Sequence, residues 1–218
     1  MFQFFCPSLH SLTSINSLLP PLLRVFHNLP PTSPCPITAP LAHVIHSLIT
    51  IPVTPTLRST WLDLQSTSGN SASPRTESLS RTSTSLNIDN SYDVLQHAYD
   101  LFEDSFSHYF PGNTDPDDPE IRTRCKAESS DNLDDMLSPL VVLITKLCIA
   151  DEESRTRVQH WIVPEDLDRS SPLEERSDIT GKCLRLLSCV YHPQLKDAVG
   201  ELLFAIADSD GRIFILFP

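Results

Sequence analysis

The sequence predicts an all-α protein, an α-solenoid of stacked helical hairpins. Apolar residues recur at three- and four-residue intervals in several separate runs, which is the pattern of helices with one buried face. Proline, glycine and capping residues separate these runs, and the loops in the second half of the chain are short. Because short loops make consecutive helices antiparallel neighbours, successive pairs are expected to stack on one another.

The clearest helical pattern lies in the second half, where residues 91–209 are expected to form helical hairpin repeats. The first strong helix there has an apolar stripe at Leu137, Leu140, Val141, Ile144, Leu147 and Cys148. Asp151 is expected to cap the next helix, which ends before Pro164. Together these two helices make one hairpin.

Two more helices are expected after that hairpin. The sequence Ser171-Pro172-Leu173-Glu174 has the form of a capping box, so it is expected to start a helix that continues to Tyr191, with Val190 on its apolar face. Pro193 is expected to open the last helix, which Asp208 ends. This pair makes a second hairpin.

Residues 1–62 are expected to form helical repeats punctuated by proline. An apolar stripe runs from Ile15 to Phe26, but Pro20 and Pro21 lie inside it. Because an interior proline costs a helix about 3 kcal/mol, the stripe is expected to divide into two short helices at this pair. A clearer helix is expected over residues 41–49.

Between the two helical parts, residues 63–90 are expected to form a disordered linker. Twelve of the twenty residues from Ser66 to Ser85 are serine or threonine, so the segment has too little apolar surface to offset its ordering entropy. Ser91 is then expected to cap a helix with an aromatic-rich face. The last segment, 210–218, is an atypical apolar tail.

Charge and cysteine content exclude several classes of protein. The net charge of −12 opposes binding to the phosphates of nucleic acid, so no nucleic-acid partner is expected. The six cysteines contain no C-x-x-C pair, and we interpret them as reduced thiols packed as small apolar groups, with disulfides or a zinc site as the alternative. No apolar run reaches the length of a membrane span, so a cytoplasmic protein is expected.

No catalytic, cofactor-binding or metal-binding constellation is found in the sequence. The five glycines are too scattered for a phosphate-binding loop, so direct nucleotide binding is not expected. His43 and His46 lie three residues apart, but no third metal ligand follows at a recognisable spacing. The acidic segment 115–120 lacks the glycine and the glutamate of a calcium loop, and we interpret it as a solvated loop. Binding, not covalent chemistry, is therefore the expected activity.

Several strings resemble the synembryn family in its fungal form. They include LSPLVVLITKLC at 137–148, KCLRLL at 182–187, DAVGELLF at 197–204 and HVIHSLITIP at 43–52. The resemblance is carried by the order of these strings, which extends from about residue 15 to 209, since none of them is a catalytic signature. The tail 210–218 departs from the family pattern, and we interpret the chain as an internal fragment of such a protein.

The resemblance implies an armadillo/HEAT-like superhelix whose concave face binds the C-terminal helix of a heterotrimeric G-protein α subunit (Gα). Family members are guanine nucleotide exchange factors and folding chaperones for Gα. Drawing that helix away from the nucleotide-binding core of Gα would weaken the binding of GDP. The site of the helix and the site of GDP on the partner would thus be coupled. It also implies peripheral contact with the plasma membrane, at the cell cortex, through Gα.

Two residues are predicted to bind the partner. Lys182 and Arg185 lie three positions apart beside an apolar stripe, where two cations could meet the terminal carboxylate of a partner helix. The alternative is a pair of surface charges that aids solubility. Two other functions stay open: a generic α-solenoid scaffold without exchange activity, and an inert truncated product that exposes Phe102, Phe106 and the tail from Ile213 to Phe217.

Overall fold

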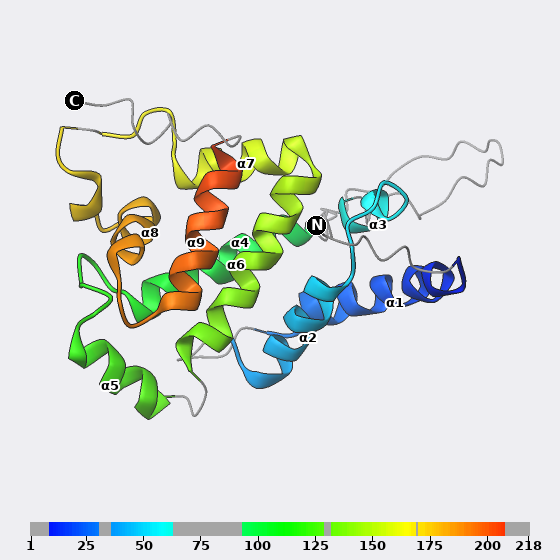
Figure 1. The fold of residues 1–218 in the computed structure, drawn as a ribbon, viewed down its shortest axis with the longest axis horizontal. Helices are drawn as coiled ribbons and strands as arrows, with labels where there is room; N and C mark the ends of the chain where they lie inside the picture. Colours follow the sequence, from blue (N-terminus) through cyan, green and yellow to red (C-terminus); the bar gives the residue numbers. More distant parts are fainter. Residues whose placement is uncertain (1–8, 31–35, 63–92, 129–131, 169, 208–218) are drawn as a thin grey trace, which may run out of the picture.

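The computed structural model describes residues 9–30, 36–62, 93–128, 132–168 and 170–207, with side chains from residue 17 onward (Figure 1). Within these ranges the regular secondary structure is entirely helical and contains no strand, which confirms the all-α prediction. The predicted linker at 63–90 and the tail at 210–218 lie outside the described residues, so the proposed division of the chain into segments stays a prediction.

The described chain contains nine α-helices and one short 3-10 helix. In order they are α1 (Leu9–Asn28), α2 (Ala39–Thr50), α3 (Arg58–Leu62), α4 (Val94–Tyr109), α5 (Pro119–Glu128), α6 (Leu133–Ala150), α7 (Glu152–Ile162), η1 (Leu173–Glu175), α8 (Ile179–Ser188) and α9 (Pro193–Ile206).

Helix α6 is the centre of the molecule. It packs along α9 on one side and against α2 on the other, while α4 lies behind it and α7 follows it in sequence and packs on it (Figure 1). The N-terminal ends of α6 and α9 lie together, because the Asp134 carboxylate accepts the backbone N–H of Gln194 at 3.2 Å. Helix α1 packs on α2, and α8 packs on α9.

Three predicted helices of the second half, α6, α7 and α9, are confirmed. The apolar stripe of α6 is buried at every predicted position: Leu137, Leu140, Val141, Ile144, Leu147 and Cys148. The Asp151 carboxylate accepts the backbone N–H of Ser154 at 2.7 Å and so caps α7, and Pro193 starts α9. The local pattern was sufficient here because each helix has one buried face.

The predicted capping box at Ser171–Glu174 is wrong. Residues Leu173–Glu175 form only a 3-10 turn, and α8 starts at Ile179 with Asp178 as its N-cap, whose carboxylate accepts the backbone N–H of Gly181 at 3.0 Å. The Arg176 side chain donates to Asp178 at 2.6 Å and so favours this later start. Since α8 ends at Ser188, Val190 is not on a buried helix face, and 74% of it is exposed.

The predicted break at Pro20 and Pro21 is also wrong, since α1 continues through both prolines. Leu19, Leu23 and Phe26 are fully buried along one side of this helix. Burial of such side chains contributes about 1.5–3 kcal/mol each. That gain offsets the cost of the two missing backbone donors. The rule that an interior proline breaks a helix considers the helix alone and does not include this gain from burial.

The aromatic face of α4 is buried, so the expected exposure of Phe102 and Phe106 is wrong. The tail from Ile213 to Phe217, which the same interpretation includes, lies outside the described residues. The two rings lie 4.2 Å apart between centroids, and at most 1% of either residue is exposed. The N-cap of α4 is Asp93, whose carboxylate accepts the backbone N–H of Gln96 at 3.0 Å, in place of the predicted Ser91, which lies outside the described residues.

The four described cysteines are all buried, and none of them forms a disulfide. Burial raises the pKa of Cys148 and of Cys183 to about 12, so both are protonated at neutral pH. Cys6 and Cys35 lie outside the described residues. Among the helices that the structure describes, none has both the length and the apolar character needed to cross a bilayer.

Candidate partner-binding face

Helices α2, α6 and α9 present exposed residues on the side away from the interior, and we call this surface the α2–α6–α9 face. Each helix contributes one exposed stripe at three-, four- or seven-residue spacing. The face comprises His43, His46, Ser47 and Thr50 of α2, Asp135, Val142 and Ile149 of α6, and Asp197, Glu201 and Phe204 of α9.

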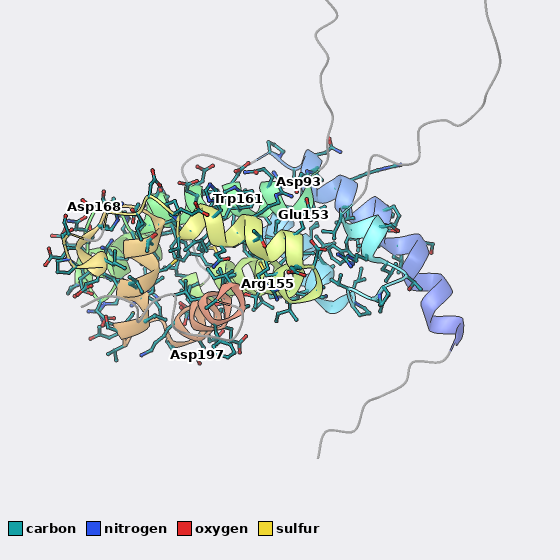
Figure 2. All side chains as sticks on the ribbon, turned by 90° about the horizontal axis from the view of Figure 1, so that it is seen from above. Asp93, Glu153, Arg155, Trp161, Asp168 and Asp197 are labelled. Carbon is teal, nitrogen blue, oxygen red and sulfur yellow. The ribbon has the colours of Figure 1, made fainter. Side chains whose placement is uncertain are left out.

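The position of this face follows from what covers the other sides of α6. Helix α6 is flanked by α2 and α9, and α4 and α7 pack against its remaining surface, so Val142 and Ile149 must point away from them. Figure 2 shows Asp197 on the side of α9 that is turned away from α4. The three stripes therefore face the same way.

The centre of the α2–α6–α9 face is apolar. Ile149 is 71% exposed, Phe204 is 57% exposed and Val142 is 36% exposed. Exposed apolar residues that gather on adjacent helices are typical of surfaces that bind another protein. Single exposed leucines elsewhere on a monomer carry no such implication.

The charges on this face are divided between its two edges. The α9 edge carries Asp197 and Glu201, and Asp135 lies at the adjoining end of α6. Helix α2 contains no acidic residue and exposes His43 and His46. The face is therefore acidic at α9 and without negative charge at α2.

The two predicted partner contacts, Lys182 and Arg185, lie on α8 and make contacts inside the chain. Only 6% of Lys182 is exposed, and its Nζ donates to Ser107 Oγ at 3.0 Å. Burial lowers the pKa of Lys182. The structure thus does not place this ammonium group on the surface.

Arg185 joins three segments of backbone. Its guanidinium donates to the carbonyl oxygens of Gly112 at 2.8 Å, of Arg176 at 2.7 Å, and of Glu174. These bonds tie the loop after α4 and the loop before α8 to α8 itself. The role of Lys182 and Arg185 in partner binding stays a prediction, since these contacts show only what the two side chains do within the chain.

The acidic loop 115–120 is more than a solvated segment, because Asp117 reaches across to the turn between α8 and α9. Its carboxylate accepts the backbone N–H groups of Val190 and Tyr191 at 3.0 Å and the Cys189 thiol at 2.9 Å. Desolvation opposes ionisation of Asp117, but these three donors outweigh it and lower the pKa of Asp117. Sequence spacing gives no sign of this contact.

Several cations bind carbonyl oxygens at the C-terminal ends of helices. Lys146 Nζ donates to Ile49 at the end of α2, and Arg124 donates to Tyr109 at the end of α4 at 2.6 Å. Lys196 donates to the carbonyl of Cys189, which follows α8, at 3.2 Å. Each of these positive charges thus lies at the negative end of a helix dipole, where it is stabilising.

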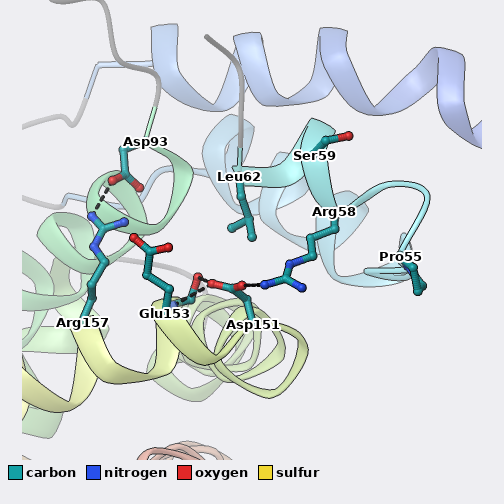
Figure 3. Close-up of a pocket in the computed structure, with 9 residues that line it drawn as sticks. Pro55, Arg58, Ser59, Leu62, Asp93, Asp151, Glu153 and Arg157 are labelled. Atoms are coloured by element: carbon teal, nitrogen blue, oxygen red, sulfur yellow. Dashed lines mark hydrogen bonds and ion pairs between the residues drawn. The ribbon is translucent and has the colours of Figure 1, made fainter. Parts of the chain in front are cut away.

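A polar cleft of about 480 Å³ lies between α3, α4 and α7 (Figure 3). Arg58 pairs with Asp151, and Arg157 pairs with Asp93, while the Glu153 carboxylate points into the space between these pairs. Two arginines thus face three carboxylates, which does not favour an anionic ligand. The Arg58–Asp151 pair connects α3 to the start of α7, and the Arg157–Asp93 pair connects α7 to the start of α4.

The part of the chain that the structure describes contains no group of three histidine, cysteine or acidic side chains placed to bind a metal ion. His43 and His46 are both exposed on α2. Among the described residues, the geometry offers an exposed face on adjacent helices. The class of protein that this arrangement defines is a helical protein with an exposed, partly apolar face.

The family follows from a sequence comparison. A family model described as guanine nucleotide exchange factor synembryn matches residues 2–216, so the chain belongs to the synembryn family of guanine nucleotide exchange factors. The matched range contains all three helices of the α2–α6–α9 face. Comparison with curated proteins and with solved structures gives no significant match.

Proposed function

We propose that this protein is an exchange factor that binds Gα and promotes GDP release, with no covalent chemistry of its own. The observation that carries the proposal is the family match over residues 2–216. The exposed α2–α6–α9 face supports it, because an exchange factor needs a surface for its partner and no nucleotide site. A folding-chaperone role toward Gα belongs to the same proposal.

The proposed architecture is an armadillo/HEAT-like solenoid. Two features support it: α6 packs between α2 and α9, and the N-terminal ends of α6 and α9 lie together. Equivalent helices of successive repeats lie side by side in the same direction in solenoids. The α2–α6–α9 face would then be the surface that such a stack offers to an extended partner.

The proposed mechanism is conformational. The C-terminal helix of Gα binds the α2–α6–α9 face, and the binding energy is available only when that helix has left the nucleotide-binding core. Binding and GDP release are thereby coupled, and the coupling is reciprocal: GDP bound to Gα weakens binding to this protein. The proposed location is the cytoplasm, with recruitment to the cell cortex through Gα.

The experiment is GDP release from purified Gα in the presence of the full chain. We expect the chain to accelerate GDP release. The double variant Val142→Glu, Ile149→Glu should slow the accelerated rate at least about tenfold, because it places two charges where the partner would bury apolar side chains. Val190→Glu is the matched control, since that valine is exposed on a different surface. Binding of Gα without acceleration would instead support a scaffold, and no binding would refute the proposal.

A further inference from the structure

Ser171 and Pro172 have the sequence of a helix start, yet the next α-helix, α8, begins only at Ile179. We propose that Ser171 is a phosphorylation site, modified by a protein kinase that requires a proline directly after the serine, and that the phosphate binds the guanidinium of Arg176. The loop that carries Ser171 connects α7 to α8 and contributes no residue to the α2–α6–α9 face, so the proposed site does not depend on the proposed function.

The backbone around Ser171 has the conformation that a kinase needs. Ser171 and Pro172 are both exposed, and Pro172 has the extended angles φ −53° and ψ 129°. A proline also restricts the residue before it to extended conformations, which keeps Ser171 out of a helix. The serine hydroxyl must reach the γ-phosphate of ATP inside the kinase cleft, so an exposed, extended loop is the form in which it can be presented.

Two other serine or threonine residues in the described part of the chain precede a proline, and neither is presented in this way. Ser138 lies inside α6 and is only 9% exposed. Thr54 is partly buried, and its hydroxyl is hydrogen-bonded to that of Thr56 at 2.9 Å. Because all three residues are followed by proline, burial and hydrogen bonding are what single out Ser171.

The proline contributes specificity as well as conformation. It has no backbone N–H, so a kinase pocket without a hydrogen-bond acceptor at this position accepts proline and leaves the N–H of any other residue unsatisfied. Ser170 is also exposed, but the residue after it is Ser171, which has an N–H. The two neighbouring serines thus differ in the one feature that such a kinase recognises, and Ser170 is a matched internal control.

Phosphorylation changes the charge of this loop. The Ser171 Oγ atom attacks the γ-phosphorus of ATP, the new O–P bond forms as the bond to the ADP oxygen breaks, and the hydroxyl proton passes to the aspartate base of the kinase. The product carries a charge of about −1.5 to −2 at neutral pH. Glu174 and Glu175 are exposed in the same loop, so a cation is needed to offset their repulsion of the phosphate.

Arg176 is placed to provide that cation. Its guanidinium donates to the carbonyl oxygen of Asp168 at 3.0 Å and to the Asp178 carboxylate at 2.6 Å, so it lies between the two ends of the loop that contains Ser171. A phosphate carries more negative charge than a carboxylate and can accept two parallel hydrogen bonds from a guanidinium. The phosphate would therefore replace Asp178 as the partner of Arg176.

The first test is phosphorylation of the full chain by a purified cyclin-dependent kinase with ATP, with each phosphate located by mass spectrometry of proteolytic peptides. We expect phosphate on Ser171 and none on Ser138 or Thr54. Pro172→Ala should slow phosphorylation of Ser171 at least about tenfold, because it restores a backbone N–H. Ser170→Ala is the matched control and should leave the rate unchanged. An unchanged rate with Pro172→Ala would refute the requirement for proline.

The second test asks whether the phosphate binds Arg176. Thermal midpoints are measured for the phosphorylated and unphosphorylated forms of the unchanged chain and of Arg176→Gln. Phosphorylation should lower the midpoint by roughly 2–4 °C more in Arg176→Gln than in the unchanged chain, because the repulsion from the glutamates is then no longer offset. Arg58→Gln is the matched control, since Arg58 also pairs with an aspartate but lies in the cleft between α3 and α7. In that variant, phosphorylation should change the midpoint as in the unchanged chain.

Two results would overturn the site, and a third would overturn the phosphate contact. If Ser171 stays unmodified in the chain while a synthetic peptide of residues 166–178 is phosphorylated, the fold does not present this serine. If the peptide stays unmodified as well, the sequence does not suit this class of kinase. Equal changes of midpoint with and without Arg176 would remove its guanidinium as the partner of the phosphate. None of these measurements involves Gα, so their failure leaves the proposed function unaffected.

Discussion

The Nζ atom of Lys146 lies 2.9 Å from the carbonyl oxygen of Ile49, so a side chain from near the C-terminal end of α6 caps the C-terminal end of α2. The same amine donates to the carbonyls of Leu48, at 3.4 Å, and of Ile51. Burial lowers the pKa of Lys146 to about 8, while the three carbonyls and the negative end of the α2 dipole favour its charged form. One lysine therefore joins two helices of the α2–α6–α9 face.

Replacing Lys146 with methionine should lower the free energy of unfolding by about 2 kcal/mol. Methionine retains the apolar stem, so the loss reports the hydrogen bonds from a charged donor, which contribute about 1.5–3 kcal/mol. Urea denaturation followed by circular dichroism measures it. Lys126→Met, at an exposed position on α5, is the control and should change stability by less than about 0.5 kcal/mol. Equal effects of the two substitutions would contradict a capping role for Lys146.

Asp117 should make stability depend on pH. Because its folded-state pKa lies below its ordinary value of 3.8, the stabilisation that it provides is fully present above that value and is lost as pH falls through the lower folded value. Asp117→Asn should cost about 1–2 kcal/mol at pH 7, since the amide retains only one acceptor oxygen. The difference between the two proteins should shrink as the pH falls below about 4.

Urea midpoints between pH 7 and pH 3 measure this difference. Glu120→Gln is the control, because Glu120 lies three residues from Asp117, in the first turn of α5, and is exposed. It should follow the pH dependence of the unchanged protein. A constant difference between Asp117→Asn and the unchanged protein across this range would show that ionisation of Asp117 does not stabilise the turn between α8 and α9.

Variants of Arg185 and Lys182 can show whether these residues only stabilise the fold or also bind the partner. Because its guanidinium donates to the carbonyls of Gly112, Arg176 and Glu174, Arg185→Gln should lower the free energy of unfolding by about 2 kcal/mol. Gα affinity is then measured with Arg185→Gln and with Lys182→Met at a temperature where both variants are folded. Affinity equal to that of the unchanged protein would remove the pair from the partner site.

The helices and their buried faces could largely be predicted from the sequence, because a helix with one buried side repeats its apolar residues locally. The stripe of α6 and the start of α9 at Pro193 are confirmed for this reason. The start of a helix could not be predicted where two residues compete to cap it. Ser171 and Asp178 could both cap a helix, and the neighbouring Arg176 favours the later cap at Asp178.

The candidate face was not predictable from the sequence. Ile149 and Phe204 have the same apolar character as their buried neighbours, and only the positions of α4, α7 and α8 leave them exposed. Conversely, the spacing of Lys182 and Arg185 suggested surface cations, while a serine of α4 and the loop at Gly112, both distant in sequence, accept their hydrogen bonds. Exposure and long-range hydrogen bonds are properties of the assembled helices, not of a local pattern.

Two glycines inside helices should respond to alanine in opposite directions. A Cβ atom at Gly181 in α8 would lie 2.2 Å from the carbonyl oxygen of Arg176, and backbone cannot move aside cheaply, so Gly181→Ala should destabilise the protein by about 3 kcal/mol. At Gly200 in α9 the nearest atom would be Leu187 Cδ2 at 3.7 Å, an ordinary contact. Gly200→Ala should therefore stabilise the protein by about 0.5–1 kcal/mol, through helix propensity and lower entropy of the unfolded chain.

Thermal unfolding of both variants tests this pair. The direction of each shift is the result that matters, because both substitutions add the same methyl group to a helix and differ only in what surrounds it. A lower midpoint for Gly181→Ala with a higher midpoint for Gly200→Ala would support the close packing of α8 against the loop at Arg176. A rise in both midpoints would mean that this loop does not lie against α8, and it would also contradict the hydrogen bond from Arg185 to the carbonyl of Arg176.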